Sequence, residues 1–251
     1  MTSNPEDTPS SPVPEGPPDT GDRPKIALTI AAHPDDSDFG CAGTAHIWSQ
    51  QGWEFYYLIC TDGSKGTDDP SMPADRLVPM RRKEQRAAAD VLGVKDVFFL
   101  DGYVDGELTP SRQLLGDVVR HIRMIKPYAV FTHDATQLIM RNSFINHSDH
   151  RAAGLTAIDA VYPAARDRLN FPEHLNEGLE PHKVKEVFIW GSEQANFVVD
   201  ISDVVETKIQ ALLRHTSQFG EGEEFLKFVR ERWKDEEGRF TERFRRVSLV
   251  R

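Results

Sequence analysis

The sequence predicts an α/β protein with a Rossmann-like, mostly parallel sheet flanked by helices, forming a single domain behind a disordered N-terminal tail. Short apolar segments alternate with helix-forming segments of ten or more residues, which is typical of βαβ units. Residues 25–32 are a short apolar run of the kind that forms buried parallel strands. With 251 residues, 39% of them hydrophobic, the chain has enough apolar material for a substantial core.

Strands and helices are expected in a regular order along the chain. The predicted strands are residues 25–32, 54–60, 97–100, 128–132, 184–190 and 196–200. The predicted helices are residues 42–51, 76–92, 114–125, 148–161, 202–216 and 222–235. Gly52 and Gly93 end the first two helices, Pro127 and Pro163 follow the next two, and Ser202 is the expected N-cap of the fifth.

Residues 1–24 differ in composition from the rest of the chain. They contain seven of the 16 prolines, and Met1 and Val13 are their only apolar residues. A segment of this kind buries too little surface to offset its ordering entropy. We therefore expect a disordered Pro-rich tail over residues 1–24 and one folded domain over residues 25–251.

Composition also excludes several classes of protein. Two cysteines, Cys41 and Cys60, are too few for a disulfide framework or a cysteine-based zinc site. Neither a run of about 18 apolar residues nor a secretory leader is seen, so no membrane partner and a cytoplasmic location are expected. The net charge of −10 argues against nucleic acid as the main partner, because phosphate binding needs a basic surface.

Polar side chains gather after two of the predicted strands. His33, Asp35 and Asp36 follow the first strand, while His147 and His150 open the helix beyond the fourth. In a parallel sheet, ligands bind outside the carboxyl ends of the strands, so both segments are expected at one edge. His33, Asp36 and His150 would then form a two-histidine, one-carboxylate set for a catalytic zinc.

The remaining residues of these segments suit amide hydrolysis. Asp35 would be the general base, and His147 would stabilise the oxyanion or protonate the leaving amine. Taken singly, each segment also fits turn chemistry, helix capping or surface polarity. Two other classes stay open: a non-haem Fe(II) oxygenase, whose facial triad uses the same residue types, and a non-catalytic sugar-binding module. His133 at the end of the fourth strand is a further candidate substrate contact.

Residues 32–36, Ala-His-Pro-Asp-Asp, followed by Gly40, Gly43 and Thr44, resemble the N-terminal signature of the PIG-L/LmbE-like deacetylase family. Residues 147–151 resemble its second signature, and residues 81–93 resemble its helix after the second strand. The stretches 178–183, 196–203 and 215–219 resemble the diacetylchitobiose deacetylase branch.

The resemblance implies a zinc-dependent hydrolase of N-acetylglucosamine-type sugars or their conjugates, with Fe²⁺ as an alternative metal. It implies His33, Asp36 and His150 as metal ligands, Asp35 as base, and His147 as electrostatic stabiliser or acid. It also implies substrate binding by Arg81 and Asp105, and assembly as a trimer or hexamer. An amidase of a low-molecular-weight thiol conjugate is the alternative within the family, although Ile145 stands where some thiol-pathway members carry a tyrosine.

Overall fold

The computed structural model describes residues 15–219, 222, 226–227, 229 and 233–249. A seven-stranded sheet has the order β3-β2-β1-β4-β7-β9-β8, and a separate hairpin pairs β5 with β6. The strands are β1 (Ile26–Ala31), β2 (Glu54–Ile59), β3 (Asp96–Phe99), β4 (Ala129–His133), β5 (Ile139–Met140), β6 (Phe144–Ile145), β7 (Glu186–Trp190), β8 (Phe197–Asp200) and β9 (Thr241–Ser248). All pairings from β3 to β7 are parallel, and β9 runs antiparallel to both β7 and β8. The predicted mostly parallel sheet is confirmed.

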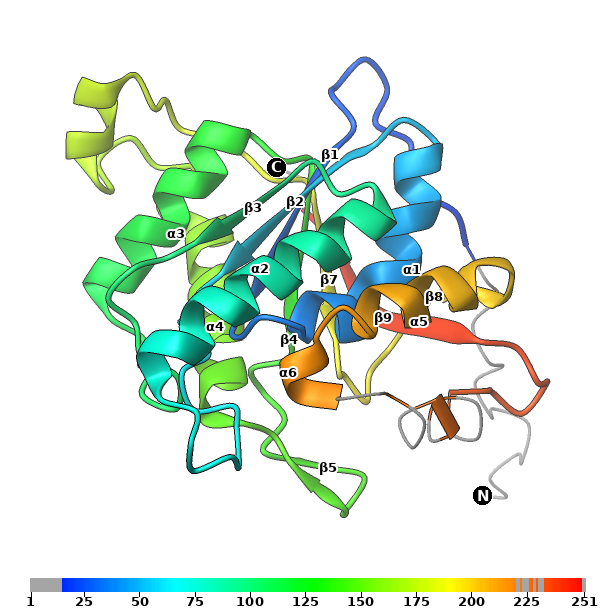
Figure 1. Ribbon diagram of the computed structural model, residues 1–251. Helices are drawn as coiled ribbons and strands as arrows, with labels where there is room; N and C mark the ends of the chain where they lie inside the picture. Colours follow the sequence, from blue (N-terminus) through cyan, green and yellow to red (C-terminus); the bar gives the residue numbers. More distant parts are fainter. Residues whose placement is uncertain (1–14, 220–221, 223–225, 228, 230–232, 250–251) are drawn as a thin grey trace, which may run out of the picture.

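Helices cover both faces of this sheet, as Figure 1 shows. They are α1 (Asp36–Gln50), α2 (Ala74–Leu92), α3 (Arg112–Ile125), α4 (Ser148–Asp159), α5 (Val205–Leu212) and α6 (Thr216–Phe219), with shorter turns η1 (Ala160–Ala164), η2 (Pro172–Glu177) and η3 (Ser202–Val204). Helices α1, α2 and α5 contact one another on one face, while α3, α4 and η1 do so on the other. No helix in the described part of the chain is long and apolar enough to cross a membrane.

The core is divided by the sheet because neighbouring residues of a strand point to opposite faces. In β1, Ala27 and Ala31 belong to the cluster beneath α1 and α2, whereas Leu28 and Ile30 belong to the cluster beneath α3 and α4. Central strands buried on both faces explain the unbroken apolar runs in the sequence.

The strand order reverses direction between β1 and β4. From β1 the chain proceeds to β2 and β3 on one side, and it then crosses back to place β4 on the other side. The carboxyl ends of β1 and β4 therefore flank the switch point, which is where open parallel sheets bind their ligands.

Most predicted bounds lie within one or two residues of those in the structure, but the predicted helices 42–51 and 202–216 differ by more. Helix α1 begins at Asp36 rather than at residue 42, and its non-helical residue Cys41 (φ −150°) separates a first turn from the predicted segment. Ser202 is not an N-cap. Its hydroxyl accepts from the backbone N–H of Phe240, and the predicted helix 202–216 divides into η3, α5 and α6.

Strand β9 and the β5–β6 hairpin were not predicted. Strand β9 has the sequence TERFRRVS. Its buried residues Glu242 and Phe244 alternate with more exposed ones, but the many charged residues obscure this period-two pattern in the sequence. Half of the predicted helix 222–235 lies outside the described residues, and its predicted last residues, 233–235, are not helical.

Of the predicted tail, residues 1–14 also lie outside the described residues, whereas residues 15–24 contact the domain. The backbone N–H of Glu15 donates to the carbonyl of Val198 at 2.7 Å, and the hydroxyl of Tyr128 donates to the carbonyl of Asp19 at 3.1 Å.

Candidate active site

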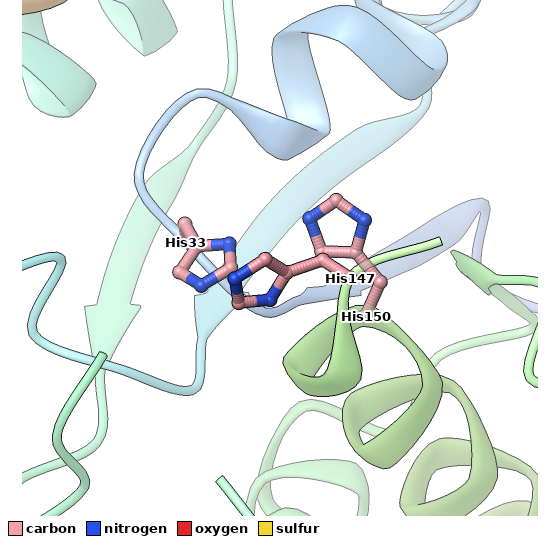
Figure 2. Close-up of side chains that lie close together, drawn as sticks. All are labelled: His33, His147 and His150. Carbon is pink, nitrogen blue, oxygen red and sulfur yellow. The ribbon is translucent and has the colours of Figure 1, made fainter. Parts of the chain in front are cut away.

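A cavity of about 370 Å³ opens at the carboxyl edge of the sheet. All seven residues predicted from the sequence line it: His33, Asp35, Asp36, Arg81, Asp105, His147 and His150. Figure 2 shows the three imidazoles converging, one from the loop after β1 and two from the start of α4. The two remote segments therefore meet, as the fold rule for parallel sheets predicts.

Asp36 lies between two histidines of the cavity. Its Oδ2 is 3.2 Å from Nδ1 of His33, and its Oδ1 is 3.1 Å from Nε2 of His150. Three overlapping sets of possible metal donors are found here, each with its donor atoms within 4.8 Å of one another: His33–His147–His150, Asp36–His133–His150 and His33–Asp105–Asp149. The cluster is able to hold a metal ion.

The electrostatics of the cluster favour a cation at its centre. Nε2 of His33 lies 3.1 Å from carboxylate oxygens of both Asp105 and Asp149. Burial opposes a charge on His33, but the carboxylates of Asp36, Asp105 and Asp149 outweigh it and raise the pKa of His33 to about 12. Burial likewise opposes a charge on Asp36, yet the surrounding imidazoles, that of His150 foremost, hold the Asp36 pKa well below its usual range.

Asp35 occupies a different environment from its neighbour Asp36. Burial and the negative charge of Asp36 raise the pKa of Asp35 to about 6, against the opposing effect of Arg81. Its Oδ2 accepts from Nη2 of Arg81 at 3.1 Å, and its backbone N–H donates to Oε1 of Gln85 at 2.7 Å. A carboxylate whose pKa is raised toward neutrality is suited to proton transfer.

His147 faces the cavity from the N-terminal end of α4. The backbone N–H of Asp149 donates to Nδ1 of His147 at 3.2 Å, and partial burial together with the nearby His33 lowers the His147 pKa. A neutral imidazole whose Nδ1 accepts a hydrogen bond carries its proton on Nε2. His147 therefore offers an N–H donor to a molecule in the cavity.

Arg81 and Asp105 line the cavity and also bind its walls. Arg81 is 3% exposed, and its guanidinium donates to the carbonyls of Pro34 and Gly63 at 2.7 and 2.9 Å. Asp105 accepts from the backbone N–H of Lys65 at 3.1 Å. Both residues thus shape the loops around the site in addition to facing its interior.

Asp149 was assigned no role in the site from the sequence. Asp149, fully buried within the second signature, accepts from the backbone N–H groups of Gly106 and Leu108 and faces His33. Its position in the sequence between two candidate site residues, His147 and His150, could have pointed to this role.

His133 packs behind Asp36, not in the cavity, with its Nε2 3.4 Å from Asp36 Oδ2, and the indole N–H of Trp190 donates to its Nδ1 at 3.1 Å. Its position at the end of β4 correctly indicated that it lies near the site. It contacts Asp36 instead of lining the cavity, where a substrate contact was expected from the sequence.

Comparison with known proteins gives one consistent family. The PIG-L family model, described as GlcNAc-PI de-N-acetylase, matches residues 28–161. Diacetylchitobiose deacetylase of Thermococcus kodakarensis is 36% identical over 197 residues, covering 78% of this chain and 71% of that protein. A probable N-acetyl-alpha-D-glucosaminyl L-malate deacetylase 2 of Bacillus anthracis is 25% identical over 204 residues, covering 76% and 80%.

A solved structure agrees with these matches. N,N'-diacetylchitobiose deacetylase from Pyrococcus horikoshii, complexed with its inhibitor MPG, has a TM-score of 0.81 and 33% identity, covering 89% of this chain and 84% of that chain. The family and fold that the sequence motifs predict are confirmed. The chain belongs to the PIG-L family of metal-dependent N-deacetylases.

Proposed function

We propose that this chain is a zinc-dependent hydrolase that removes the acetyl group from an N-acetylglucosamine-type amino sugar or a conjugate of one. The observation that carries the proposal is the placement of Asp35 in the same cavity as the cluster of His33, Asp36 and His150. The names of the three similar proteins reported above, each a deacetylase of an amino sugar or its conjugate, support the substrate class.

His33, Asp36 and His150 would hold the metal. Nε2 of His33 already faces Asp105 and Asp149, so Nδ1, on the side of Asp36, is the atom left for a metal ion. A carboxylate partner of this kind behind a histidine ligand fixes its tautomer and orientation. Bound zinc supplies Lewis acidity that polarises the amide carbonyl and lowers the pKa of water, and Fe²⁺ suits the same donors.

Asp35 and His147 would divide the proton chemistry between them. Asp35 takes a proton from the attacking water, whose oxygen adds to the amide carbonyl carbon. The Nε2–H of His147 donates to the carbonyl oxygen as negative charge develops there. The C–N bond then breaks, Asp35 returns the proton to the amine nitrogen, and acetate and the free amino sugar are the products.

The test is acetate release from a panel of acetylated compounds. N-acetylglucosamine, N,N'-diacetylchitobiose, an N-acetylglucosaminyl malate, an N-acetylglucosaminyl inositol and an N-acetylated cysteine conjugate are incubated with zinc-loaded, Fe²⁺-loaded and chelator-treated protein. We expect acetate from sugar amides with metal-loaded protein only, and turnover confined to the cysteine conjugate would favour the thiol alternative.

Two results would reject the proposal. Sugar binding without turnover across the whole panel would indicate a non-catalytic sugar-binding module. Dioxygen uptake with an oxoacid cosubstrate would indicate an oxygenase.

A further inference from the structure

Asp35 has a backbone conformation that residues with side chains rarely adopt. Its φ is 105° and its ψ is −30°. Such values are costly and persist only where the surrounding structure holds them. The residue lies where the chain leaves β1 and enters α1, so a relaxation of φ toward its usual negative range would rotate the carboxylate out of the cavity.

Gln85 of α2 holds this backbone from behind. Its side chain is fully buried. Its Oε1 accepts from the N–H of Asp35 at 2.7 Å, and its Nε2 donates to Oδ2 of Asp38 at 2.8 Å. Because a backbone N–H only donates and a carboxylate only accepts, these two partners fix the amide in a single orientation.

Asp38 is fixed in turn from the C-terminal part of the chain. Nε2 of His215 lies 2.8 Å from the same Oδ2 atom, and both residues are fully buried. Arg81, one turn before Gln85 on α2, binds the Asp35 carboxylate and the carbonyl of Pro34. Helix α2 therefore contacts Asp35 at two points: Arg81 binds the Asp35 side chain, and Gln85 binds the Asp35 backbone N–H.

We propose that Gln85 is a positioning residue that keeps Asp35 in its left-handed conformation and so aims the carboxylate into the cavity, with Asp38 and His215 orienting the Gln85 amide. This inference rests on the proposed function, in which Asp35 is the base. Gln85 itself does not line the cavity, so it acts on catalysis through Asp35 and not through substrate or metal.

The test uses the zinc-loaded full chain and a reversal of donor and acceptor. Gln85→Glu keeps an acceptor for the Asp35 N–H but sets a second carboxylate against Asp38. We expect kcat to fall at least about tenfold, KM to change by less than about threefold, and the zinc content to stay at the wild-type level. In the double variant Gln85→Glu/Asp38→Asn, the amide donor is at position 38 and the carboxylate acceptor is at position 85. The hydrogen bond between the two positions can then form again, and kcat should recover to within about threefold of wild type.

Thr44→Val is the matched control, because it removes a buried hydrogen bond to a carboxylate, 2.6 Å long, from a residue that does not touch Asp35. It should lower stability and leave kcat unchanged.

Wild-type kcat in Gln85→Glu, zinc loss in that variant, or a double variant no better than the single one would each overturn the inference while leaving the proposed function intact. Absence of acetate release by the wild-type protein would instead reject the function, and the role of Gln85 with it.

Discussion

The carboxylate of Glu242 accepts two hydrogen bonds from Thr44, one from its backbone N–H at 2.7 Å and one from its hydroxyl at 2.6 Å. The break in α1 at Cys41 interrupts the helical hydrogen bonds, and the N–H of Gly43 also turns to Glu242, at 2.9 Å. A strand at the far end of the chain thus caps the second half of the helix that follows the metal cluster. Lys208 completes the contact, with its Nζ 2.6 Å from Glu242 Oε1.

Glu242→Ala is therefore expected to destabilise the fold strongly. The change leaves the ammonium of Lys208, which is 3% exposed, without its carboxylate. Breaking one side of a buried ion pair costs about 3–5 kcal/mol. The free energy of unfolding, measured in urea, should fall by that amount.

Glu236→Ala, at an exposed glutamate of the same segment, is the control and should change stability by less than about 0.5 kcal/mol. Equal effects of the two substitutions would contradict the capping role of Glu242.

The central part of the site could be predicted from the sequence, whereas the contacts of Glu242 could not. The apolar run of β1 and the His-Pro-Asp-Asp segment after it were enough to place His33 and Asp36 at the edge where His150 also lies, because parallel sheets order their carboxyl ends in a fixed way. Strand β9 was not predicted because one of its buried residues is the charged Glu242. Its burial follows from tertiary contacts with Thr44 that the sequence pattern does not reveal. The supporting role of Gln85 was likewise invisible, since its partner is a backbone group 50 residues away.

The His215–Asp38 pair gives the fold a specific pH dependence. Burial opposes a charge on His215, but the hydrogen bond to Asp38 and the charges of Asp38, Asp35 and Glu84 outweigh it and raise the His215 pKa. The folded state therefore holds this proton more tightly than the unfolded state, whose histidine titrates near pH 6.5. The stabilisation is complete below about pH 6.5 and is lost as pH rises through the raised pKa.

His215→Gln should remove this dependence while keeping a donor to Asp38. Unfolding free energies of both proteins are measured in urea from pH 6 to 9. The advantage of the wild-type protein should be largest at the acid end and shrink toward the alkaline end. A constant difference across the series would mean that the proton on His215 does not contribute.

His150→Ala is expected to abolish tight metal binding. Nε2 of His150 lies 3.1 Å from Asp36 Oδ1, so the substitution removes one of three proposed donors. Asp149→Asn leaves all three proposed donors in place and changes the carboxylate behind His33, which also accepts from the backbone N–H groups of Gly106 and Leu108. Its loss of affinity should be about 10–100-fold, smaller than that of His150→Ala.

Zinc affinity is measured by competition with a chromogenic chelator, and His46→Ala, on α1 away from the cavity, is the control. Wild-type affinity in His150→Ala would exclude that histidine as a ligand.

Asp35→Asn separates metal binding from catalysis. The substitution keeps the size of the side chain and an oxygen for Arg81, but an amide cannot accept the proton of water at neutral pH. We expect kcat for acetate release to fall about 10²–10⁴-fold, the range for loss of a general base, with zinc content unchanged.

Asp101→Asn provides the matched control for this loss, because Asp101 accepts a hydrogen bond from Arg82, the neighbour of Arg81, at 2.7 Å on the exposed side of α2. It should retain wild-type kcat. Turnover by Asp35→Asn within about threefold of wild type would show that the proton of water goes elsewhere, and His147 would then be the next residue to test as the acceptor.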